Sequence, residues 1–69
     1  MSGPDGRSKV AGLYVRVAET LERSAQLADQ HAERDRSNGR PDSAAVELER
    51  ARRAREAARR GRALAARMQ

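Results

Sequence analysis

The chain contains no cysteine, isoleucine, phenylalanine or tryptophan, and only one tyrosine among its 69 residues. Without cysteine it can form neither a disulfide bond nor a thiolate metal site. Strands favour β-branched and aromatic residues, so their scarcity argues against a fold built on a sheet. One histidine cannot build a metal site alone. We therefore expect no metal and no cofactor.

Large apolar residues are also few: five leucines, four valines, two methionines and one tyrosine, against 14 alanines. Below about 70–80 residues a single core rarely supplies more than roughly 3–5 kcal/mol. A chain of this size and composition is therefore expected to gain stability by association.

Neither a targeting segment nor a membrane span is apparent in the sequence. The N-terminal residues 1–9 are polar and rich in glycine and serine, with no apolar run after them. No stretch approaches the roughly 18–20 apolar residues that a membrane span requires. These features predict a cytoplasmic protein without membrane insertion.

Strong helix formers dominate what is present. Alanine, glutamate, lysine, leucine and arginine make up 40 of the 69 residues, a composition typical of a long helix or a coiled coil. Arginine alone occurs 14 times, and the formal net charge is +5. The composition therefore predicts an all-α, basic protein.

One segment carries the chemistry of a turn between two helices. Asn38-Gly39 can adopt the left-handed conformation that ends a helix, and Pro41 cannot continue that helix. Asp42 or Ser43 can then cap the next helix. A short connection makes the two helices antiparallel neighbours. The predicted organisation is a flexible tail over residues 1–7, a helix over about 8–36, a turn over about 37–42 and a helix over about 43–67.

Both predicted helices carry a stripe of near-heptad spacing, which predicts a coiled-coil-like hairpin with an alanine-rich seam. Folding at the turn places Val17 opposite Gly61, so large residues on one helix meet small ones on the other. The first stripe comprises Val10, Tyr14, Val17, Leu21, Ser24, Ala28 and His31. The second comprises Ala44, Leu48, Ala51, Ala54, Ala58, Gly61, Ala65 and Met68.

Three acid–arginine pairs have the four-residue spacing that stabilises a helix. In each, the acid precedes the arginine, which is the more favourable order. These pairs support the helix assignments and are Glu19–Arg23, Glu49–Arg53 and Glu56–Arg60.

Four apolar residues lie beside the predicted seam and are not used by it: Leu13, Leu27, Ala57 and Leu64. Exposed apolar strips of this kind mark association sites, and two hairpins can pair into a four-helix bundle. The sequence therefore predicts a small interaction protein that packs against itself as a homodimer or against another helical protein. The residues expected to carry this contact are Val10, Leu13, Tyr14, Val17, Leu21, Leu27, Leu48, Leu64 and Met68.

An arginine-rich face on the second helix gives an alternative function. Its arginines could neutralise phosphates as part of a basic nucleic-acid-associated protein, with affinity that falls steeply as salt rises. A single tyrosine makes no base-stacking platform, so such binding would be non-specific. No nucleophile–base pair or paired catalytic carboxylates are apparent, so no enzymatic activity and no small-molecule substrate are expected. The candidate phosphate-contacting residues are Arg52, Arg55, Arg59 and Arg62.

Overall fold

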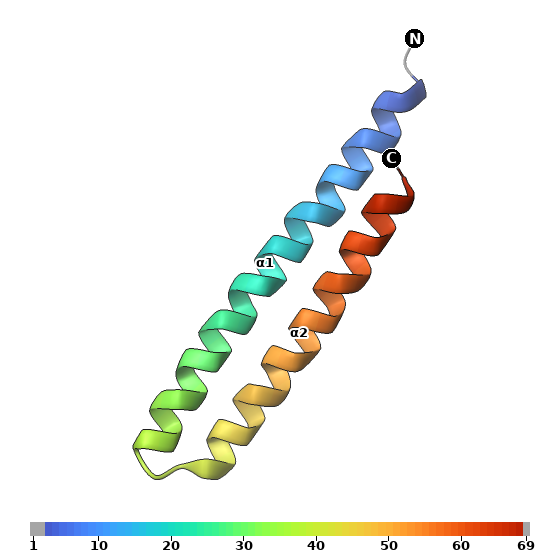
Figure 1. Cartoon of the computed structure of the whole chain (residues 1–69). Helices are drawn as coiled ribbons and strands as arrows, with labels where there is room; N and C mark the ends of the chain where they lie inside the picture. Colours follow the sequence, from blue (N-terminus) through green and yellow to red (C-terminus); the bar gives the residue numbers. More distant parts are fainter. Residues whose placement is uncertain (1–2, 69) are drawn as a thin grey trace.

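A computed structural model describes residues 3–68 as two helices joined by a tight turn (Figure 1). Helix α1 spans Gly3–Ser37 and helix α2 spans Pro41–Arg67. The helices run antiparallel and pack side by side in a rod 59 Å long (Figure 1). No strand occurs between residues 3 and 68, so the predicted all-α hairpin is confirmed for that part of the chain.

Helix α1 begins at Gly3, earlier than the predicted start near Ser8. A proline is compatible with the first turn of a helix, because the amide it lacks would have no partner there. Pro4 occupies such a place. Residues 3–7 of the predicted tail are therefore helical, whereas residues 1–2 lie outside the described residues. At its N-terminal end α1 extends beyond the end of α2 (Figure 1).

The turn ends α1 in the way that the sequence predicts. Gly39 has a φ of +75°, in the left-handed region that glycine adopts without steric cost. The amide of Gly39 donates to the carbonyl of Arg36 at 3.1 Å, and that of Arg40 donates to Asp35 at 2.7 Å. This pair of bonds is the Schellman arrangement, which satisfies the last carbonyls of a helix.

The start of α2 differs from the prediction. Arg40 is the N-cap residue and makes no capping hydrogen bond with its side chain, so neither Asp42 nor Ser43 is the cap. Pro41 takes the first helical position, for which its fixed φ is well suited. Asp42 lies in the first turn instead, where its negative charge interacts favourably with the helix dipole.

The buried centre of the contact between the two helices consists of alanine. All nine buried residues between Gly6 and Met68 are alanines, and eight of them recur at intervals of seven along each helix. Ala25, Ala28 and Ala51 form one packed cluster with Ala54 against it, so Ala25 and Ala51 lie at the same level. Because the helices are antiparallel, a step of seven residues forward on one helix corresponds to a step of seven back on the other. The remaining heptad alanines pair in this way. This alanine interface consists of Ala11, Ala18, Ala25, Ala28 and Ala32 on α1, and Ala44, Ala51, Ala58 and Ala65 on α2.

The predicted stripe of α1 is wrong at four of its seven positions. Val10 and Val17 are 40% and 54% exposed, and Ser24 and His31 are exposed as well. Each of these four residues comes directly before a buried alanine. The prediction placed the larger apolar side chains in the seam, whereas alanine allows the two backbones to approach closely. Tyr14, Leu21 and Ala28 do lie at or beside the interface, as predicted.

Gly61 lies at the close approach, although its neighbours differ from the prediction. A Cβ atom at Gly61 would be 3.4 Å from the carbonyl oxygen of Tyr14 and 3.8 Å from the Cβ of Ala18. The predicted partner Val17 is instead largely exposed. Gly61 therefore faces the backbone of α1, as expected of a glycine within a packed helix.

Candidate functional site

One flank of the hairpin carries two ion pairs between the helices. Arg62 donates to Glu22 through Nε at 2.9 Å and Nη2 at 2.8 Å, and Arg55 donates to Asp29 at 2.5 Å. All four residues lie four positions after a buried alanine, which places them on the same side of the interface. We call these residues (Glu22, Asp29, Arg55 and Arg62) the ion-pair flank.

The ion pairs shift the pKa of three of the groups that they join. The hydrogen bonds from Arg62 hold the pKa of Glu22 below its ordinary value. The same bonds raise the pKa of Arg62, and the bond to Asp29 raises that of Arg55. The two pairs link the helices at a fixed register.

The opposite flank is apolar towards the open end of the hairpin. Val10, Val17, Ala57 and Leu64 each directly precede a buried alanine. On a helix such a position lies about 100° to one side of that alanine, whereas the ion-pair residues lie about 40° to the other side. Leu13 lies one turn from both Val10 and Val17 and extends this surface outward. We call Val10, Leu13, Val17, Ala57 and Leu64 the apolar flank.

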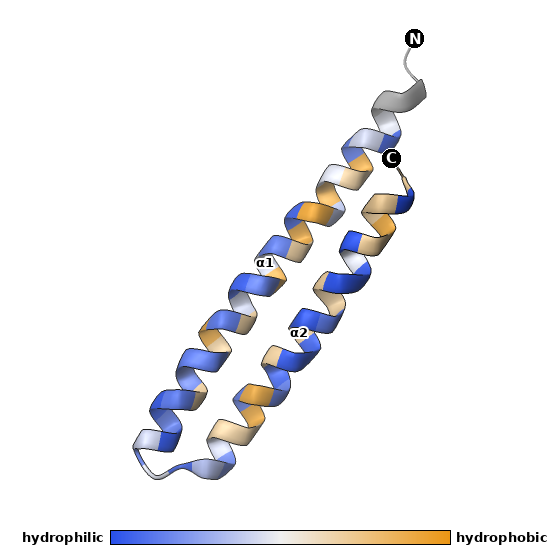
Figure 2. Cartoon of the chain, viewed as in Figure 1, coloured by the Kyte–Doolittle hydropathy of each residue, from blue (hydrophilic) through white to orange (hydrophobic). Residues whose placement is uncertain are grey.

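The predicted contact residues are largely accessible to a partner. Orange apolar positions recur along both helices in Figure 2, between hydrophilic stretches in blue. Leu48 follows Ala44 by four positions and therefore lies on the side of the ion-pair flank, away from Val10 and Leu64. Three predicted residues are partly buried beside the alanine interface: Tyr14, Leu21 and Met68. Six are exposed by 38–55%: Val10, Leu13, Val17, Leu27, Leu48 and Leu64.

Three of the four candidate phosphate-contacting arginines already bind carboxylates. Arg55 and Arg62 pair across to α1, and Arg52 pairs with Glu49 and Glu56 on its own helix. Arg59 has no ion-pair partner among the described residues. A phosphate would therefore have to compete with an intramolecular carboxylate at three of these positions.

Of the three acid–arginine pairs predicted within the helices, one forms as predicted, and in the other two a different partner is bound. The Arg53 Nε donates to Glu49 at 3.0 Å, which confirms that pair. Glu56 instead accepts from Arg52 at 2.9 Å. Arg52 lies one turn before Glu56, whereas the predicted partner Arg60 lies one turn after it. Arg23 donates to the hydroxyl of Thr20 at 3.2 Å. Both alternative partners lie three or four positions away, the spacing at which helical neighbours meet.

Sequence reasoning missed the two ion pairs between the helices. The signal was present, since an acid follows Ala18 and Ala25 by four positions and an arginine follows Ala51 and Ala58 by four. It could be recognised only once the alanines were known to form the interface. The roles of Glu22 and Asp29 thus depend on the register of the hairpin.

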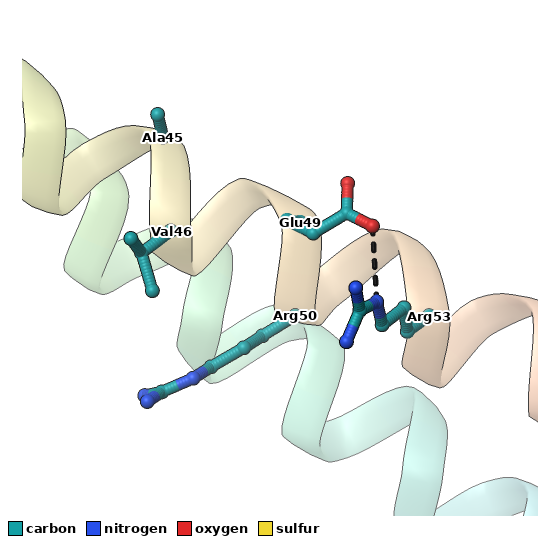
Figure 3. A pocket seen from close by; sticks show the side chains of 5 residues that line it. All are labelled: Ala45, Val46, Glu49, Arg50 and Arg53. Atoms are coloured by element: carbon teal, nitrogen blue, oxygen red, sulfur yellow. Dashed lines mark hydrogen bonds and ion pairs between the residues drawn. The ribbon is translucent and has the colours of Figure 1, made fainter.

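The surface hollows are shallow and exposed. Figure 3 shows one on the outer side of α2, where the side chains of Ala45, Val46, Glu49, Arg50 and Arg53 all come from the same helix. An ion pair joins two of these side chains, Glu49 and Arg53. In the described residues no group of three or more His, Cys, Asp or Glu side chains could hold a metal ion. Between Gly3 and Met68, no helix is long and apolar enough to cross a membrane.

Comparison with known proteins adds no further assignment. No protein-family model matches this chain, and no curated protein or solved structure matches it either. The functional proposals therefore rest on the residues and their geometry.

Proposed function

We propose that this chain is a small helical interaction protein that acts by packing its apolar flank against another helix, without catalytic chemistry of its own. One observation supports this proposal. Only alanine is buried among the described side chains, while seven leucine and valine side chains remain 38–55% exposed. Burying one such side chain contributes about 1.5–3 kcal/mol. A second helical surface would thus supply the apolar contacts that the alanine interface lacks.

Self-association is one form that this function can take. Two hairpins that pack through their apolar flanks would make a four-helix bundle and leave most of the arginines of α2 in water. Because each chain carries a net charge of +5, repulsion would oppose the homodimer. Moderate salt would then strengthen self-association by screening that repulsion.

The test compares the wild-type chain with a chain altered on the apolar flank. Light scattering over a range of concentrations measures the molar mass, and a labelled amphipathic helical peptide reports binding to a partner. We expect the wild type to associate with itself or with the peptide. The double variant Leu13→Glu with Leu64→Glu should lose this association yet keep its helicity, because both side chains are exposed in the hairpin.

Leu48→Glu is the matched control, since Leu48 is 44% exposed and lies towards the other flank. This variant should associate as the wild type does. A wild-type chain that stays monomeric and binds no helical peptide would contradict the proposed function.

A basic nucleic-acid-associated protein is the second candidate. The spacing of Arg52, Arg55, Arg59 and Arg62 favours it, since steps of three and four place them along one face of α2. Their ion pairs weigh against it. Salt separates the two candidates, because phosphate binding should collapse between about 50 and about 200 mM salt, whereas apolar packing should not.

A further inference from the structure

The apolar flank is surrounded by arginine, and this charge pattern indicates what covers it. We propose that its occupant is an acidic amphipathic helix of another protein, and not a second copy of this chain. The inference rests on the proposed function and specifies its partner. It is carried by the side chains around the flank and by the distribution of charge along the hairpin.

Three shallow hollows each include at least one residue of the apolar flank, and each combines apolar side chains with arginine. On α1, Leu13, Val17 and Leu21 line the first together with Arg16 and Thr20. At the open end of the hairpin, Val10 and Met68 line the second together with Gly6 and Arg7.

The third hollow lies on α2, where Ala63 and Leu64 are flanked by Arg60 and Arg67. No carboxylate from the described part of the chain lines any of the three hollows. A helix that packed on the apolar flank would bring its apolar stripe against leucine and valine and its polar edges towards the arginines of these hollows. Carboxylates on those edges would meet a complementary charge.

The charges of the hairpin are segregated along its length. Six of the ten acidic residues lie between residues 29 and 49, around the turn, whereas twelve of the fifteen basic residues lie outside that range. Residues 57–68 carry four arginines and no acid. The apolar flank therefore lies in the basic half of the molecule.

This segregation disfavours a second copy as the occupant. Two copies bury their apolar flanks only if those flanks meet, and this brings the basic half of one chain against the basic half of the other. An arrangement that instead set the acidic turn of one copy beside the basic end of the other would leave both apolar flanks uncovered. Like charges placed together at an interface select against the wrong partner. An acidic helix would cover the apolar flank and would also place negative charge beside its arginines.

The dimensions also fit a helix. The hollows on α1 run from Gly6 to Leu21, a length of about 22 Å at 1.5 Å per residue. A helical partner of about 15 residues spans that length. Its apolar residues would recur every three or four positions, as in other helices that bind in a groove.

The test uses two synthetic helical peptides with identical apolar positions. One carries glutamate at every flanking position and the other carries lysine, and fluorescence anisotropy measures the binding of each to the full chain at low and moderate salt. We expect the glutamate peptide to bind at least about tenfold more tightly at low salt, and this preference to decrease as salt screens the charges. Leu13→Glu should weaken the binding of both peptides.

Charge reversal on the chain tests the assignment independently. Arg16→Glu with Arg60→Glu changes two arginines that line the hollows and should reduce or invert the preference for the glutamate peptide. Arg34→Glu with Arg40→Glu makes the same change in net charge near the turn and should leave the preference largely intact.

The outcomes that overturn this inference differ from those that overturn the proposed function. Equal binding of the two peptides, or a wild-type dimer that excludes both of them, refutes the acidic partner but retains helix packing. Tighter binding to duplex DNA or to anionic vesicles than to the glutamate peptide also refutes it. If neither peptide binds and the chain remains monomeric, both proposals fail.

Discussion

Arg62 of α2 binds Glu22 of α1 through two parallel hydrogen bonds, from Nε to Oε2 at 2.9 Å and from Nη2 to Oε1 at 2.8 Å. The same relationship recurs seven residues along each helix, where Arg55 binds Asp29. The alanine interface repeats every seven residues along each helix, so its packing alone would tolerate a shift of one helix by seven residues against the other. The ion pairs distinguish these registers, because a slip by seven would leave only one of the two arginines opposite a carboxylate.

The two lowered glutamate pKa values predict how stability depends on pH. The pKa of Glu22 and Glu49 lies below the ordinary value of 4.5 in the folded chain, because arginines donate hydrogen bonds to both carboxylates. The unfolded chain therefore takes up protons first as the pH falls. The stabilisation is complete above about pH 4.5 and is lost as the pH falls through the lowered folded values.

The corresponding variant is Glu22→Gln with Glu49→Gln, measured by circular dichroism melts from neutral to about pH 3. Its Tm should lie below that of the wild type at neutral pH and should decrease less on acidification. An acid dependence identical to that of the wild type would show that these pairs do not contribute.

Substitutions of Gly61 test how closely the two helices approach each other at this position. A Cβ at this position would make ordinary contacts of 3.4 Å and 3.8 Å with α1, so Gly61→Ala fits. We expect it to stabilise the chain by up to about 1 kcal/mol, the helix propensity difference between the two residues. Gly61→Leu should instead destabilise by about 1–3 kcal/mol. Urea unfolding measures both, and a stabilising leucine would place Gly61 outside the interface.

The alanine interface has no room for larger side chains, whereas the outer surface of α2 can accept them. Ala51 is 1% exposed, so Ala51→Leu should force the helices apart and destabilise the hairpin by about 1–3 kcal/mol. Ala45→Leu is the control, because Ala45 is exposed on the same helix. Thermal melts of the two variants should diverge, and equal Tm values would contradict the observed interface.

The turn depends on the left-handed conformation of Gly39. With φ at +75°, Gly39→Ala should destabilise the hairpin by about 1–2 kcal/mol, the cost of this conformation for a residue with a Cβ. Gly12 lies within α1, and a Cβ there would meet nothing within 4 Å. Gly12→Ala should therefore stabilise by up to about 1 kcal/mol. In urea unfolding, Gly39→Ala should lower the midpoint and Gly12→Ala should raise it.

The sequence by itself determined the two helices and the turn, because the signals for them are local. Helix propensity, the conformational freedom of Gly39 and the missing amide of Pro41 act within a few residues, whatever the partner helix does. It also contained the heptad spacing and the arginine-rich character of α2.

Only the tertiary structure decided which side of α1 faces α2. A stripe of valine and leucine and a stripe of alanine lie one residue apart on that helix, and both have the spacing of a seam. Transfer of apolar area from water favours burial of Val10 and Val17, whereas close approach of the backbones favours Ala11 and Ala18. The hairpin buries the alanines, and this single rotation brings Glu22 to Arg62 and leaves the valines exposed for a partner.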